Sequence, residues 1–111
     1  MFFLEYYGPT GLYADLRESL RQALAEAFKT RSSAVTVRRV VTEEEQAAIE
    51  LWVELSSDEQ LYRYGREISR QLTAAVKQQA DQDVWVMFKI VPLSHAFLNG
   101  EPRARGVASF E

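Results

Sequence analysis

The sequence predicts an α/β chain in which two β-α-β units form a four-stranded mixed sheet with both helices on one face. Two observations lead to this prediction. The segments expected to be strands are rich in aromatic and β-branched residues, and one of them, residues 48–55, alternates apolar with polar residues. In the segments between the strands of each half, apolar residues recur every three or four positions. The order strand, helix, strand occupies residues 2–41 and is repeated in residues 48–91. Because a crossover helix joins parallel strands, each half should contain one parallel pair.

In the first half, residues 2–7 are rich in aromatic side chains and predict a strand. Residues 8–11 contain two glycines and a proline, which break the strand. The next segment predicts an amphipathic helix that ends near Lys29, and its apolar stripe consists of Leu12, Leu16, Leu20, Ala23 and Ala27. The β-branched residues 34–41 predict the second strand.

In the second half, the acidic residues 42–46 are interpreted as a solvated connection. Residues 48–55 alternate and predict the third strand. We expect Ser57 to cap the second helix, with Gln60 at the reciprocal position of a capping box. Residues 83–91 predict the fourth strand, and Asn99-Gly100 predicts a short hairpin in the tail, residues 92–111. One domain spanning residues 1–111 accounts for the chain.

Composition excludes several classes of function. The chain has 111 residues, of which 47% are apolar, and a net charge of −3, which argues against nucleic-acid binding. It lacks cysteine, so disulfides and thiolate chemistry are excluded. With one histidine and no phosphate-binding glycine loop, we expect neither a metal nor a cofactor. The start does not resemble a signal peptide and no apolar run matches a membrane span, so we expect a cytoplasmic protein without a membrane partner.

The second face of the sheet is expected to stay uncovered, because two helices can cover only one face. The helix-facing residues are Phe2, Leu4, Tyr6, Val35, Val37, Leu51, Val53, Val84, Val86 and Phe88. The opposite face carries Phe3, Glu5, Tyr7, Thr36, Arg38, Val40, Glu50, Trp52, Glu54, Trp85, Met87, Lys89 and Val91. Its aromatic residues form a patch that is large for a monomer. We therefore expect a homo-oligomer, the alternative being a monomer whose tail folds over this face.

Two arginines at the end of the second strand, Arg38 and Arg39, are candidates for binding a small carboxylate ligand through paired hydrogen bonds. Another pair, Arg103 and Arg105, lies in the tail. The simpler interpretation is that these arginines balance the charges of glutamates 50 and 54 on neighbouring strands.

Lys89 and His95 are the other candidates for substrate binding. Lys89 is expected either to pair with Glu5 or Glu54 or, if desolvated, to bind an acidic ligand. His95 follows the fourth strand. The alternative to a role in substrate binding is that it is an ordinary polar loop residue.

The chain resembles the tautomerase superfamily, which includes the 4-oxalocrotonate tautomerases and the macrophage migration inhibitory factor-like proteins. The resemblance rests on the strand that starts at the second residue, the duplicated units, and residues 49–55, 83–88 and 97–100. It is most similar to a small uncharacterised bacterial branch. The resemblance implies a trimer, with three sheets around a central axis and the helices outside. It also implies an N-terminal proline that acts as base or nucleophile, since a secondary amine in an apolar pocket has a depressed pKa.

This sequence has Phe2 where the family has its proline, and we expect the initiator methionine to be retained before so bulky a residue. The prediction is therefore a tautomerase-fold protein without proline-dependent tautomerase activity and with no residue assigned as catalytic.

Two alternatives remain open. The first is an isomerase or tautomerase that uses Met1, Glu54 or His95 as its base, on a small acidic substrate held by Arg38 or Lys89. The second is a ferredoxin-like module for ligand binding or interaction, in which the second and third strands would form a tight hairpin.

Overall fold

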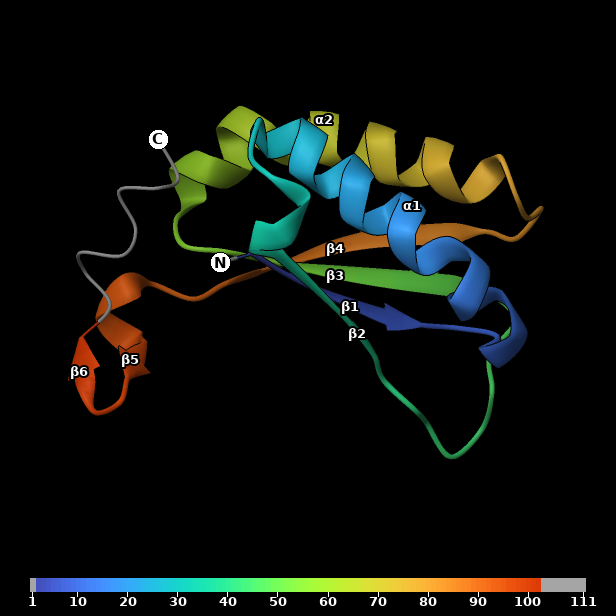
Figure 1. Cartoon of the computed structure of the whole chain (residues 1–111), viewed down its shortest axis with the longest axis horizontal. Coiled ribbons are helices and arrows are strands. Elements are labelled where there is room, and N and C mark those ends of the chain that lie inside the picture. The colour runs from blue at the N-terminus through green and yellow to red at the C-terminus, as the bar shows by residue number, and fades with distance from the viewer. Residues whose placement is uncertain (1, 103–111) are drawn as a thin grey trace.

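The computed structural model describes residues 2–102 and contains a four-stranded sheet in the order β2-β1-β3-β4 (Figure 1). The strands are β1 (Phe2–Tyr7), β2 (Val35–Arg39), β3 (Ile49–Leu55) and β4 (Val84–Ile90). The helices are α1 (Thr10–Phe28) and α2 (Asp58–Lys77), with short 3-10 turns η1 (Ser32–Ala34) and η2 (Leu93–His95). A small hairpin follows, made of β5 (Phe97–Leu98) and β6 (Glu101–Pro102).

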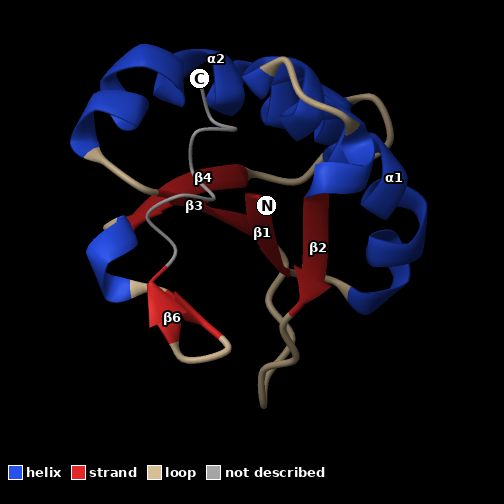
Figure 2. Cartoon of the chain, turned by 60° about the vertical axis from the view of Figure 1, so that its left-hand side comes forward, coloured by secondary structure: helices blue, strands red, loops and turns tan. Residues whose placement is uncertain are grey.

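The sheet confirms the predicted duplication. β1 is parallel to β2 and β3 is parallel to β4, while the central pair β1-β3 is antiparallel. Both helices lie on one face of the sheet (Figure 2). Because β1 lies between β2 and β3, those two strands are not neighbours. The ferredoxin-like alternative required a hairpin between them and is therefore not the fold.

The core lies between the helices and the sheet. Phe2, Leu4 and Tyr6 of β1 are buried, and so are the alternate residues of β3, as the period of two predicts. The helices contribute Leu16, Leu20, Leu24, Ile68, Leu72 and Val76, each fully buried. Burial of one such leucine contributes roughly 1.5–3 kcal/mol, so this layer holds the two halves together.

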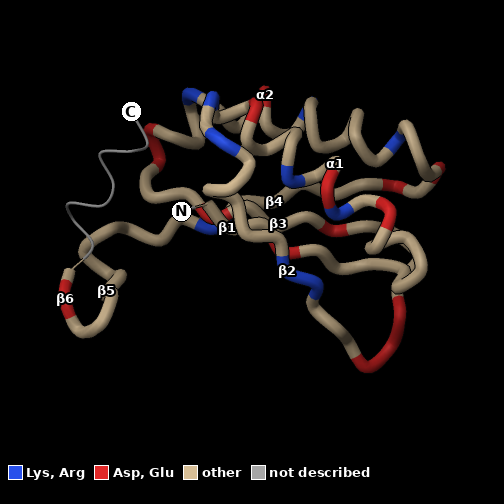
Figure 3. Tube along the Cα trace, viewed as in Figure 1, with Lys and Arg blue, Asp and Glu red and all other residues tan. Residues whose placement is uncertain are grey.

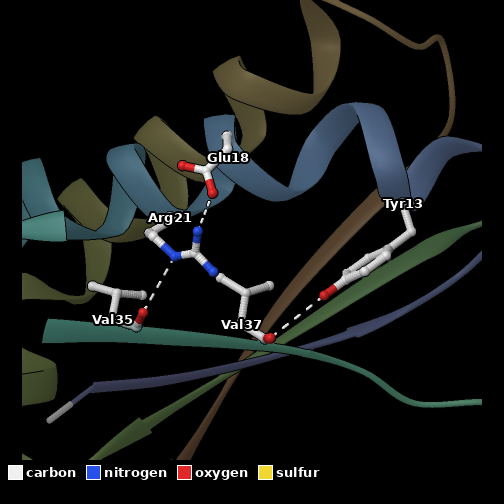
Figure 4. A network of polar contacts seen from close by, with 5 residues as sticks. All are labelled: Tyr13, Glu18, Arg21, Val35 and Val37. Carbon is white, nitrogen blue, oxygen red and sulfur yellow. Dashed lines mark hydrogen bonds and ion pairs between the residues drawn. The ribbon is translucent and has the colours of Figure 1, made fainter. Parts of the chain in front are cut away.

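Polar side chains of α1 bind the outer strand of the sheet (Figure 4). Arg21 donates from Nε to the carbonyl oxygen of Val35 at 3.3 Å and also pairs with Glu18. The hydroxyl of Tyr13 donates to the carbonyl oxygen of Val37 at 3.4 Å. Two carbonyls of β2 thus have partners within the chain, although β2 is an edge strand with a neighbour on one side only.

α2 begins as expected at Ser57, whose hydroxyl accepts from the backbone N–H of Gln60 at 3.2 Å. The reciprocal bond differs from the capping box. Gln60 Oε1 accepts from the backbone N–H of Ser56, at 2.7 Å, and from its hydroxyl, at 2.8 Å. Ser56 provides two donors to one oxygen, which favours it over the Ser57 N–H.

The second strand is shorter than the predicted residues 34–41 and ends at Arg39. Its partner β1 ends at Tyr7, where Gly8 turns the chain toward α1. The N–H of Val40 still donates to the carbonyl of Tyr6 at 2.8 Å, but Val41 has no strand beside it and is 73% exposed. In the described part of the chain, no helix is long and apolar enough to cross a membrane.

Candidate functional site

The face of the sheet away from the helices carries the candidate binding residues. Among the described residues, no helix lies on this face, as Figures 1 and 2 show. A shallow depression there is lined by Phe3, Glu5, Arg38, Trp52, Glu54 and Lys89, and its volume is about 10 Å³. That volume is enough for one water molecule. In a single chain, the depression therefore has no room for a substrate.

Lys89 lies in this depression and is already paired. Its Nζ donates to Glu5 Oε1 at 2.8 Å, and it lies over the ring of Trp52 at 5.4 Å from the centroid. The hydrogen bond with Glu5 raises the pKa of Lys89 above its ordinary value. The predicted pairing with Glu5 is confirmed. Lys89 stays protonated at neutral pH and cannot serve as a base.

The two adjacent arginines lie on opposite faces of the sheet, because successive side chains of a strand alternate. The Arg38 guanidinium lies on the open face, 4.5 Å from the centroid of the Phe3 ring. Arg39 points to the helix side and donates from Nη2 to Thr10 Oγ1 at 3.1 Å. They therefore do not form one carboxylate-binding pair.

The interpretation that these arginines balance glutamates 50 and 54 is wrong. β1 separates β2 from β3, so Arg38 lies beside Glu5 in the register. Glu50 instead accepts from Gln46 at 3.0 Å and from the indole N–H of Trp52 at 3.2 Å. Over residues 2–102, no carboxylate lies within ion-pair distance of Arg38.

The remaining candidates lie elsewhere. His95 is exposed in η2, beyond the end of β4, and does not line the depression. Arg103 and Arg105 fall outside the described residues. Within the described ranges, no group of three or more His, Asp or Glu is arranged to hold a metal ion.

Phe2 belongs to the core. Its side chain is 3% exposed, and its ring stacks on Phe28 with the centroids 4.3 Å apart. Tyr64 of α2 packs on the other ring of this pair, 5.2 Å from Phe28. The start of β1 thus supplies an aromatic ring to the contact between sheet and helices.

A second polar cluster, which the sequence analysis missed, lies at the start of α1. Pro9 precedes the helix and provides no side-chain cap. Glu45 provides one instead, since its carboxylate accepts from the backbone N–H of Thr10. A hydrogen bond with the side chain of Thr10 is the main cause of a lowered pKa of Glu45, the bond from the Thr10 backbone N–H is the second, and Arg39 lowers it further. The segment 42–46, interpreted from the sequence as a solvated connection, therefore also caps a helix. Figure 3 shows its acidic residues at the tip of the connection between β2 and β3. The sequence contained one signal of this cap: Pro9, at the start of the helix, has no side chain that could act as the N-cap.

An open groove of about 400 Å³ runs between α1 and α2 on the outer surface. Its lining is mostly polar and also includes the small side chains of Ala23, Ala74 and Ala75. The one arginine in its wall, Arg70, is paired with Glu67 at 2.5 Å. The groove therefore offers hydrogen-bonding groups but no unpaired cation.

The fold is similar to that of several solved structures. No protein-family model and no curated protein sequence matches the chain. It is similar to the structure of a domain of unknown function (DUF1904) from Sebaldella termitidis, with a TM-score of 0.72 and 15% identity over 90% of this chain and 97% of that one. It is similar to the R7 fused 4-OT asymmetric trimer, with a TM-score of 0.73 and 18% identity over 94% and 98% of the two chains. A macrophage migration inhibitory factor-like protein from Entamoeba histolytica gives a TM-score of 0.66 and 9% identity over 91% and 96%. The fold is that of the tautomerase superfamily, as the resemblance implied.

Proposed function

We propose that this chain, with its tautomerase fold, works as a homotrimer and lacks proline-dependent tautomerase activity. The observation that carries the proposal is the residue at the start of β1. A base needs a nitrogen lone pair that can accept a proton, which a terminal proline has and a peptide nitrogen lacks. Phe2 provides a peptide nitrogen when Met1 precedes it, and its ring is held in the core against Phe28.

The activity is tested with the enol form of phenylpyruvate, whose conversion to the keto form is followed by absorbance. We expect the rate in buffer to be unchanged by the protein, while a fused 4-OT enzyme assayed in parallel accelerates it. Turnover that persists after deletion of Met1 and Phe2, in a chain whose circular dichroism shows it is folded, would overturn the proposal. Turnover that this deletion abolishes also overturns it, in favour of an enzyme that uses the terminal amine.

The homotrimer is supported by the uncovered face of the sheet. Phe3, Trp52, Trp85 and Met87 lie on it, and Trp85 is 62% exposed. A similar structure, fused 4-OT, is described as a trimer. Native mass spectrometry should give three times the 12.7 kDa mass of the chain. A monomer or dimer at micromolar concentration contradicts the trimer.

A second candidate function is the binding of a small carboxylate at Arg38. The observation that favours it is the absence of a carboxylate partner for this arginine within residues 2–102. Lys89 is less suited, because Glu5 already neutralises it. Since one chain leaves too little room, the pocket would need a neighbouring subunit to complete it.

Titration with malonate, followed by tryptophan fluorescence, tests this candidate because Trp52 lines the same depression. We expect saturable quenching that is lost in Arg38→Gln and kept in Arg66→Gln, a variant of an exposed arginine on α2. Equal responses of the wild type and Arg38→Gln would exclude Arg38 as the carboxylate ligand.

A further inference from the structure

The sequence of β2 makes the outer edge of the sheet prone to pair with another strand. Residues 34–41 consist mainly of β-branched residues, with four valines and one threonine. An exposed edge of this composition presents unpaired N–H and C=O groups to any extended chain that meets it. Because β2 has a neighbouring strand on one side only, its outward groups need some other form of protection.

The backbone groups that face outward follow from the register of β2. The N–H of Val40 donates to the carbonyl of Tyr6 in β1 at 2.8 Å, so the backbone groups of Val40 point toward β1. The backbone groups of successive residues in a strand point alternately to its two sides. Those of Val35, Val37 and Arg39 therefore point away from the sheet, to the side where a further strand would bind.

Two side chains of α1 reach over the first half of this edge, as Figure 4 shows. Arg21 donates from Nε to the carbonyl of Val35 at 3.3 Å, and the hydroxyl of Tyr13 donates to the carbonyl of Val37 at 3.4 Å. Both carbonyl oxygens that an incoming strand would use are therefore already bonded, and the two side chains lie beside them.

The two side chains are held in place by other contacts. Arg21 also pairs with Glu18, one turn earlier in α1, and its side chain is only 26% exposed. The ring of Tyr13 packs on the buried ring of Tyr6, with the centroids 5.1 Å apart. A strand that displaced either side chain would therefore also have to break these contacts.

The second half of the edge is protected by charge. Arg38 and Arg39 are both exposed, and neither has a carboxylate within ion-pair distance among residues 2–102. A second copy of β2 added in parallel register would place these like charges side by side, which destabilises strand pairing.

We propose that Arg21 and Tyr13 close the β2 edge against the addition of β2 from a second copy of this chain. They act on the half of the strand that has no charge of its own, and the arginines act on the other half. The proposal concerns the edge of the sheet, whereas the proposed homotrimer is supported by its open face. Each can therefore fail without the other.

Amide hydrogen exchange in the full-length chain tests this closure, because a second strand would bind the N–H groups of Val37 and Arg39. In the wild type, both amides should exchange quickly at every protein concentration. The variant Tyr13→Phe/Arg21→Met removes both donors and keeps the ring and most of the arginine stem. In it, protection of both amides should increase with concentration by about five-fold or more, the factor expected from one net hydrogen bond.

The matched control is Tyr62→Phe/Arg17→Met, the same two changes at exposed positions of α2 and α1, and it should behave like the wild type. General loss of stability would lower protection throughout the core and would not raise it at the β2 edge. Tyr13→Phe alone loses one hydroxyl and should show part of the increase, which keeps the test decisive if the double variant does not fold.

Two results would overturn the proposal. The first is protection of the Val37 and Arg39 amides that already increases with concentration in the wild type, because the edge would then be open to a second strand. The second is a folded double variant, or a folded Tyr13→Phe, whose two amides stay as unprotected as those of the wild type at the highest concentration.

Discussion

At the scale of single residues, Gly8 occupies a place where a side chain would be tightly crowded. A Cβ at this position would lie 3.0 Å from Tyr6 Oη and 3.2 Å from Ile49 Cγ1. The Tyr6 hydroxyl donates to the Pro9 carbonyl at 2.8 Å, so it cannot move without losing that bond. We expect Gly8→Ala to destabilise the fold by about 1–3 kcal/mol.

Urea unfolding measures the loss of stability in Gly8→Ala, and Gly11→Ala is the control. A Cβ at Gly11 meets nothing within 4 Å, and the residue lies in the first turn of α1. The control should be neutral or up to about 1 kcal/mol more stable, because alanine favours the helix. Equal effects of the two changes would show that the close approach at Gly8 is unimportant.

Glu45 predicts a dependence of stability on pH. Its pKa is lowered in the folded chain by hydrogen bonds with the side chain and the backbone N–H of Thr10, and by Arg39. A group whose pKa is lower when folded stabilises the protein above its unfolded pKa, and this contribution is lost as the pH falls through the folded value. We expect Glu45→Gln to be less stable than the wild type at pH 7, and we expect this difference to become smaller as the pH is lowered toward 3.

The urea midpoint at both pH values tests this, and Glu44→Gln serves as the matched control in the same acidic segment. If Glu45→Gln and Glu44→Gln differ from the wild type by the same amount at pH 7, the stabilisation is a general charge effect and not a helix cap.

At the scale of elements, the sequence patterns located each strand and helix because each element buries one regular face. The alternation in 48–55 matches β3 to within one residue, and the helix end near Lys29 matches α1. The patterns could not predict which elements distant in the sequence lie next to each other. The order β2-β1-β3-β4 decides that Arg38 faces Glu5 and not Glu50 or Glu54, and no local spacing encodes that order.

The same reason explains the helix caps. Ser57 was predictable because it lies next to the helix that it caps, whereas Glu45 caps α1 from 35 positions away in the sequence. The same holds for the candidate site residues. The ion pair between Lys89 and Glu5 was one of the two options that the sequence predicted. That Arg38 and Arg39 lie on opposite faces became clear only from the structure of the sheet.

The local cap of α2 gives a prediction at this scale. Ser57→Ala removes the acceptor for the Gln60 N–H and should cost about 1 kcal/mol of unfolding free energy. Ser57→Asp supplies another acceptor and should retain the wild-type stability. Thermal or urea unfolding of both variants measures the difference. Loss of stability in both would indicate that the serine side chain acts through some contact other than the cap.

At the scale of the whole molecule, the two faces of the sheet differ in how far their apolar side chains are buried. The helix side is filled by buried leucines, while the other side leaves Trp85 mostly exposed and Phe3, Trp52 and Met87 half-buried. Apolar patches of this kind on a soluble protein mark surfaces of contact. Assembly should therefore protect Trp85 from small molecules in the solvent, and the protection should depend on protein concentration.

Acrylamide quenching of the variant Trp52→Phe isolates the signal of Trp85, since the chain has two tryptophans. We expect the quenching constant to fall as the protein concentration rises through the range in which sedimentation shows association. A constant that is already low in dilute, monomeric protein would mean that Trp85 is covered by its own chain, and association would then have to use another surface.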